Sequence, residues 1–273
     1  MNDRQVTRGF SVFALLFYLG LAGCSGGEVS RPQAAGGREA GPAPAATIVI
    51  VHGAWGGGWA FREVEQLLRD SGHQVYRPTL TGQGERYHLA SPEIDLETHI
   101  ADVVNVLEFE ELEDVVLVGH SYGGMVVTGV ADRVPGRIRH LVYLDAFVPY
   151  DGESVADLAG DFMESLEASG GTSDPGFVDP TWVKPGTAPP KDVRQSMKTF
   201  TQPIRLGGDP GRGRQVSYII TRDAPGASDS FDPFADRARD RGWTVYEFEA
   251  DHNPQWSRPA ELAALLGKVA GVE

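Results

Sequence analysis

The chain is poor in cysteine and in basic side chains. Cys24 is its single cysteine in 273 residues, which excludes an intrachain disulfide framework. Lys and Arg number 24 against 38 Asp and Glu, the formal charge is −14, and the basic residues form no cluster. Because the phosphates of a nucleic acid repel an acidic protein, this composition argues against nucleic acid as a partner.

Signatures of cofactor and metal sites are also missing. The sequence contains neither Gly-x-Gly-x-x-Gly nor Gly-x4-Gly-Lys, the glycine-rich patterns that hold phosphates. Its His, Asp and Glu residues show no spacing typical of metal ligands. We therefore expect no cofactor and no metal.

The one strongly apolar run at the amino terminus, residues 10–23, is too short to span a membrane. Arg4 and Arg8 precede it, and its last residues, Leu21-Ala22-Gly23, are followed directly by Cys24. This pattern resembles a bacterial lipoprotein signal. The resemblance implies export, cleavage before Cys24 and a lipid anchor on that residue in the cell envelope. The residue after the cysteine is Ser25 and not the Asp that often favours retention in the inner membrane, so the resemblance is also compatible with an anchor in the outer membrane of a host that has one. An ordinary signal peptide or an uncleaved anchor is the alternative.

Two regions follow the predicted signal peptide of residues 1–24. Residues 25–46 are rich in Gly, Ala and Pro and nearly free of large apolar side chains, so they are expected to be a flexible tether. Residues 47–273 are long enough for one domain with a substantial core.

The domain alternates between strand-like and helix-like segments. Near-continuous apolar strands between amphipathic helices predict an α/β fold, a mostly parallel sheet with helices on both faces. The predicted strands are 47–53, 74–80, 114–120, 138–145, 214–221 and 243–250, and the predicted helices are 60–72, 96–112, 122–134, 234–242 and 259–271.

Residues 148–212 break this alternation. They are rich in Pro and Gly, show little periodicity, and carry scattered large apolar residues such as Phe162, Trp182 and Phe200. An insertion of this size is usually a lid or binding loop, so we predict a cap over the carboxyl ends of the strands. The alternative is a flexible surface loop without a function.

The stretch VVLVGHSYGG places Ser121 between a predicted strand and a predicted helix. Gly-x-Ser-x-Gly in this context is typical of a sharp turn that exposes a nucleophilic serine at a helix amino terminus. A serine hydroxyl needs a base to take its proton. Among seven histidines, His252 alone lies after the last strand and before the final helix, where a base belongs in the chain order Ser, acid, His. A solvated loop histidine is the alternative.

Two aspartates compete to orient His252. Asp145 ends the strand after the nucleophile, and Asp223 follows the next strand. Either could support the imidazolium, or could merely belong to a turn. Two N-H donors for an oxyanion are expected at Tyr122, directly after the nucleophile, and at Ala54, in the loop after the first strand.

The segments VHGAWGGGW, PTLTGQGER, DVVLVGHSYGGMVVTGVADRVP and LVYLDAFVP resemble α/β-hydrolases. The similar branch contains plant methylesterases, hydroxynitrile lyases and bacterial carboxylesterases that include pyrethroid hydrolases. The resemblance implies the α/β-hydrolase fold and supports Ser121, His252, Ala54 and Tyr122 in their roles.

The chain departs from this branch at two positions. Where the plant relatives carry the acid, this chain has Ala224, with Asp223 one step early. Asp145 occupies the place of the acid in other α/β-hydrolases, so we favour Asp145 and keep Asp223 as the alternative. Asn253 stands where the lyases carry a lysine, which argues against cyanohydrin cleavage.

The predicted function is a serine carboxylesterase acting on small or medium apolar esters. One alternative is a protein that binds or senses a small molecule without turning it over. Another is hydrolysis of a lactone, an amide or a carbon-carbon bond on the same scaffold. The sequence predicts no oligomeric state.

Overall fold

The computed structural model describes residues 45–271. The predicted signal, Cys24 and the tether up to residue 44 lie outside the described residues. Within residues 45–271, no helix combines the length and the apolar character needed to cross a bilayer.

Six parallel strands form the central sheet. Their order is β2-β1-β3-β4-β7-β8, so β3 lies near the middle. The bounds are β1 (Thr47–Val51), β2 (Gln74–Tyr76), β3 (Val115–His120), β4 (Ile138–Leu144), β7 (Gln215–Arg222) and β8 (Thr244–Glu249). Because the strands are parallel, their carboxyl ends meet at one edge, where open α/β sheets bind ligands.

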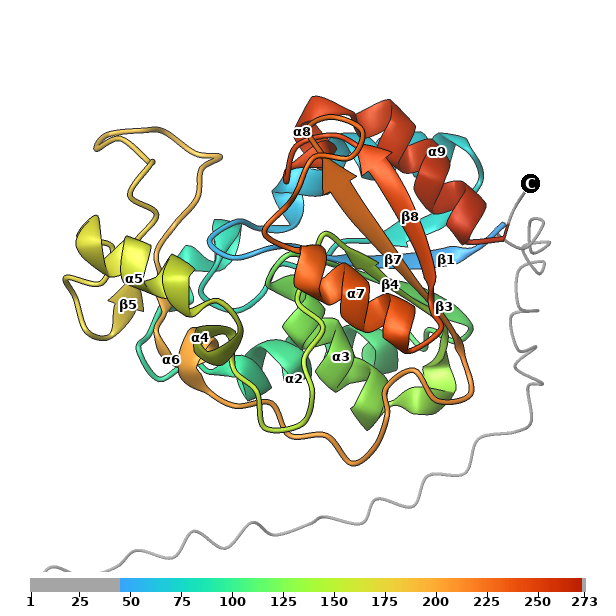
Figure 1. The fold of residues 1–273 in the computed structure, drawn as a ribbon, viewed down its shortest axis with the longest axis horizontal. Helices are drawn as coiled ribbons and strands as arrows, with labels where there is room; N and C mark the ends of the chain where they lie inside the picture. The colour runs from blue at the N-terminus through green and yellow to red at the C-terminus, as the bar shows by residue number, and fades with distance from the viewer. Residues whose placement is uncertain (1–44, 272–273) are drawn as a thin grey trace, which may run out of the picture. The chain divides into compact units, whose positions relative to one another are not determined.

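Helices cover both faces of the sheet (Figure 1). Side chains alternate along β1: Ile48 and Ile50 pack in one core, and Val49 and Val51 pack in the other. The first core includes α1 (Arg62–Asp70) and α9 (Pro259–Val269), and the second includes α2 (Leu96–Phe109), α3 (Gly123–Arg133) and α7 (Asp232–Asp240). The prediction of a parallel sheet with helices on both faces is confirmed.

Shorter elements connect these layers. The predicted strand 74–80 ends at Tyr76, because Pro78 lacks the N-H that the ladder requires. The predicted helix 60–72 begins with a 3-10 turn. The remaining bounds are η1 (Gly58–Phe61), η2 (Gly84–Leu89), η3 (Pro135–Arg137) and α8 (Pro254–Ser257).

The insertion between β4 and β7 contains more regular structure than its sequence predicts. It includes α4 (Val155–Leu158), α5 (Gly160–Ala168), β5 (Phe177–Val178), β6 (Gln195–Ser196) and α6 (Lys198–Thr201). The two short strands pair antiparallel, so they form a small sheet apart from the central one. Hereafter, the segment 148–212 is called the cap.

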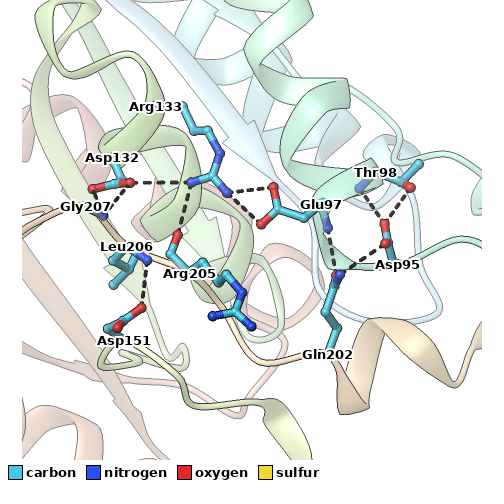
Figure 2. A network of polar contacts seen from close by, with 10 residues as sticks. All are labelled: Asp95, Glu97, Thr98, Asp132, Arg133, Asp151, Gln202, Arg205, Leu206 and Gly207. Carbon is cyan, nitrogen blue, oxygen red and sulfur yellow. Dashed lines mark hydrogen bonds and ion pairs between the residues drawn. The ribbon is translucent and has the colours of Figure 1, made fainter.

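A polar network fastens the returning end of the cap to the domain (Figure 2). Gln202 accepts a hydrogen bond from the backbone N-H of Glu97 and donates one to Asp95, at the start of α2. Arg133 at the end of α3 bonds both carboxylate oxygens of Glu97 at 2.6 Å and also donates to the carbonyl of Arg205. Arg133 thus bonds Glu97 of α2 through Nη2 and the cap residue Arg205 through Nη1, so this end of the cap is anchored to α2 and α3.

Candidate active site

Ser121 lies on the sharp turn between β3 and α3, with φ of +54°. Its carbonyl accepts hydrogen bonds from Gly124 and Phe147, which hold the turn. A Cβ on Gly119 would lie 2.7 Å from the carbonyl oxygen of Gly123, and one on Gly123 would lie 2.7 Å from that of Val51. Both positions therefore require glycine, which explains the two glycines of the Gly-x-Ser-x-Gly motif.

His252 lies between β8 and α8 and faces Ser121. Its Nε2 is 3.0 Å from Ser121 Oγ, and its Nδ1 is 2.6 Å from Asp145 Oδ2. A carboxylate only accepts, so Nδ1 donates to Asp145 and Nε2 is left to accept the hydroxyl proton of Ser121. The ring also stacks on Phe231, with centroids 4.9 Å apart and planes at 12°. This arrangement can pass a proton from the serine to the imidazole.

The structure brings Asp145 to His252 and leaves Asp223 apart. Asp145 follows β4, is fully buried, and accepts a second hydrogen bond from the N-H of Thr221 at 3.1 Å. Asp223 is exposed after β7, and its side chain makes no hydrogen bond within residues 45–271. The geometry therefore favours Asp145 of the two acids that the sequence left open.

The two predicted oxyanion donors flank the serine. Ala54 and Tyr122 line the same cavity as Ser121. Neither backbone N-H donates a hydrogen bond to another group in the described part of the chain. The Tyr122 hydroxyl donates to His99 Nδ1 at 2.9 Å, and burial raises the pKa of that phenol well above its usual value. A neutral, tethered side chain helps to fix the backbone at this position.

Buried histidines lie around the serine, and no local sequence pattern distinguishes them from the other histidines. Burial lowers the pKa of His52 and His99 to about 4 and that of His120 to about 3. The His120 ring donates from Nε2 to the carbonyl of His252 at 2.8 Å. His52 accepts from the N-H of Leu80, so these neutral rings connect loops around the site.

A cavity of about 1040 Å³ opens above Ser121 and extends under the cap. Its lining is largely apolar and aromatic, and includes Trp55, Phe162, Trp182, Phe200 and Trp256. The cap aromatics were noted in the sequence, but their convergence on Ser121 depends on contacts between distant segments that no local pattern encodes.

The charged side chains in the cavity wall are all acidic. Among the described residues, Asp161 and Asp192 line the cavity and no Lys or Arg does. Burial raises the pKa of Asp192, opposed by the hydrogen bond that Trp182 Nε1 donates to it at 2.8 Å. No group of His, Cys, Asp and Glu within residues 45–271 is arranged to hold a metal ion.

Comparison with known proteins identifies the family. The profile of the Alpha/beta hydrolase family matches residues 48–265. The carbendazim hydrolyzing esterase of Nocardioides sp. is 38% identical over 249 residues, covering 81% of this chain and 98% of that enzyme. Methylesterase 9 of Arabidopsis thaliana is 27% identical over 250 residues, covering 81% of this chain and 97% of the plant protein.

A solved structure shows the same fold. It is an extracellular alpha/beta-hydrolase from a Paenibacillus species, described as sharing structural and functional homology with tobacco salicylic acid binding protein 2. It is 24% identical, has a TM-score of 0.69, and covers 82% of this chain and 98% of its own. The predicted fold class and the predicted resemblance to bacterial esterases and plant methylesterases are confirmed. The chain thus belongs to the alpha/beta hydrolase family.

Proposed function

We propose that the protein is a serine carboxylesterase that hydrolyses small or medium neutral apolar esters through an acyl-enzyme. The observation that carries this proposal is the hydrogen-bonded series from Ser121 through His252 to Asp145, at 3.0 and 2.6 Å, facing a cavity lined by apolar side chains. The esterase names of its relatives support the same reaction class.

In the first half of the proposed reaction, Ser121 Oγ attacks the ester carbonyl carbon while its proton passes to His252 Nε2. The carbonyl π electrons move to the oxygen, and the N-H groups of Ala54 and Tyr122 stabilise the resulting oxyanion. Asp145 keeps the imidazole oriented and stabilises its cation. The C–O bond then breaks, and the alcohol leaves with the proton from His252.

In the second half, water attacks the acyl-Ser121 carbonyl and gives a proton to His252. The tetrahedral intermediate again places its oxyanion on the same two N-H groups. Its collapse expels Ser121 Oγ, which recovers the proton from His252, and releases the carboxylic acid. The free enzyme is regenerated without a metal or cofactor.

The cavity wall supports a neutral apolar substrate. Aromatic side chains such as Trp55, Trp182 and Phe200 offer faces and edges to a planar group. The carboxylates of Asp161 and Asp192 would repel an anionic ester. None of the described residues that line the cavity is a Lys or Arg that would offset this repulsion. Neutral esters with an aryl or short alkyl group are therefore the proposed class.

The amino-terminal signal adds a proposal about location. We propose that Cys24 carries lipid and holds the enzyme on a membrane of a bacterial cell envelope, with a small-molecule ester as its substrate. This proposal rests on the sequence pattern alone, because Cys24 lies outside the described residues.

A panel of esters tests the proposed function. The purified protein lacking residues 1–24 is assayed with p-nitrophenyl acetate, butyrate and octanoate, with methyl benzoate, and with a p-nitrophenyl ester that carries a free carboxylate. We expect turnover of the neutral short esters and poor turnover of the anionic one. Binding of the neutral esters without any release of acid would instead favour a binding or sensing protein and would contradict the proposal.

A further inference from the structure

Trp55, the neighbour of the proposed oxyanion donor Ala54, has an unusual backbone. Its φ is +60°, in the left-handed region that bulky L residues rarely adopt. Such a conformation costs of order 1 kcal/mol or more and persists only where surrounding contacts enforce it. Three glycines, at 56–58, follow directly, so the loop itself is not stiff.

One contact at this turn is local, since the N-H of Gly56 donates to the Ala54 carbonyl at 2.7 Å. The other polar contacts of Trp55 come from the cap. Gln195 Oε1 accepts the backbone N-H of Trp55 at 2.8 Å. The N-H of Val193 donates to the Trp55 carbonyl at 2.9 Å. The indole Nε1 of Trp55 donates to the carbonyl of Val178 at 3.0 Å. Both backbone polar groups and the ring nitrogen of Trp55 are thus bound by residues more than 120 positions away.

Gln195 is itself held firmly. Its side chain is buried, with 1% of the residue exposed, and its Nε2 donates to Thr199 Oγ1 at 2.8 Å. This second bond fixes which end of the amide faces Trp55. The Trp55 ring packs against Phe162, Trp182 and Phe200, with centroids 5.0–6.0 Å apart, so the cap surrounds the loop residue from several sides.

We propose that Gln195 is a positioning residue for the oxyanion hole, acting through Trp55 on the N-H of Ala54. An oxyanion donor stabilises the transition state only when it lies about 2.7–3.1 Å from the developing charge. The Gln195 amide fixes the peptide between Ala54 and Trp55. The Ala54 N-H belongs to the preceding peptide, and holding the peptide that follows restricts the backbone rotations at Ala54 that aim this N-H. The inference rests on the proposed function, and it makes the cap part of the rate-enhancing machinery as well as a wall of the cavity.

The test replaces Gln195 with methionine, which keeps the length of the side chain and removes the acceptor. In the purified full chain, we expect kcat for p-nitrophenyl acetate to fall about tenfold or more. Removal of a whole oxyanion donor costs about 10²- to 10³-fold, and here the donor is only displaced. KM should stay within about twofold, because the oxyanion forms after the substrate binds.

Ser217→Ala is the matched control. Ser217 is also fully buried, and its hydroxyl bonds His140 Nε2 at 2.9 Å within β7, before the carboxyl end of the strand. Its loss should lower the melting temperature and leave kcat near the parent value. If Gln195→Met loses no more kcat than this control, or only raises KM, the inference is wrong. Gln195→Asn, whose shorter amide withdraws the acceptor, gives the same comparison if the methionine variant does not fold.

A transition-state analogue adds a readout specific to the oxyanion. An aryl trifluoromethyl ketone forms a hemiketal with Ser121, and its former carbonyl oxygen occupies the oxyanion hole. Its inhibition constant should rise in Gln195→Met by the factor that kcat/KM falls, and an unchanged constant would contradict the inference. If the parent enzyme hydrolyses no ester, the proposed function itself is wrong. If the parent is active and Gln195→Met behaves like the Ser217→Ala control, only the role of Gln195 is wrong.

Discussion

Replacing the carboxylate of Asp145 with an amide should nearly abolish turnover. In Asp145→Asn, the amide oxygen can keep the hydrogen bond from the Thr221 N-H, and the amide nitrogen then faces His252 Nδ1. Two donors cannot bond each other, so the imidazole shifts its proton to Nε2 and can no longer accept from Ser121. The cation that forms during the reaction also loses its buried counter-charge.

The size of the effect follows from this geometry. Asp145 is fully buried, and its charge-assisted bond to Nδ1 measures 2.6 Å, so solvent does not compensate for its loss. The same change in a serine-protease triad lowers kcat about 10⁴-fold, a barrier change of about 5.5 kcal/mol. Asp223→Asn is the matched control, because Asp223 is exposed and makes no side-chain hydrogen bond within residues 45–271. Its kcat should stay within about tenfold of the parent.

Initial rates with p-nitrophenyl acetate give kcat, and circular dichroism with thermal melts shows that each variant is folded. A large loss at Asp223 with little change at Asp145 would refute the reasoning and transfer the role to Asp223. Small losses at both positions would show that another group orients His252.

The remaining predictions concern pH, charge and location. Burial holds the pKa of His52, His99 and His120 below the ordinary 6.5, so between pH 6.5 and about pH 4 these rings bind protons in the unfolded chain and not in the folded one. The free energy of unfolding should therefore be unaffected by these rings above pH 6.5 and should fall as the pH drops toward 4, by up to about 1.4 kcal/mol per pH unit for each ring. Urea midpoints that are equal at pH 7.5 and pH 5 would contradict this. Asp192→Asn should raise kcat/KM for an anionic ester relative to a neutral one by roughly fivefold, a repulsion near 1 kcal/mol, and an unchanged ratio would remove Asp192 from substrate selection. Cys24→Ser should lose lipid labelling and leave the membrane fraction; equal partitioning of both forms would contradict the anchor.

The sequence predicts both Ser121 and His252, and the constraints on Ser121 are local. The apolar run of β3, the two glycines that the turn requires and the helix after it lie within a few residues of Ser121. His252 follows from the order of strands and helices. The parallel sheet is equally readable, since continuous apolar strands alternate with amphipathic helices.

The acid and the cap could not be predicted in the same way. Asp145 and Asp223 follow β4 and β7, which are neighbours in the sheet, so both stand at the correct edge. The choice depends on backbone and side-chain direction, since Asp145 turns inward with φ of +43°. Gln195 lies in a segment without periodicity, and its partner Trp55 is 140 positions away, so its role depends on tertiary packing alone.

The most direct test of the central claim is covalent labelling of the serine. A fluorophosphonate should react with the purified protein once, and mass spectrometry of its peptides should place the phosphonyl group on Ser121, because only a serine activated by a base attacks such a probe readily. In Ser121→Ala, labelling and ester hydrolysis should disappear together while the melting temperature shows a folded protein. A phosphonyl group on another residue, or labelling and turnover that persist in Ser121→Ala, would contradict the assignment of Ser121 as the nucleophile.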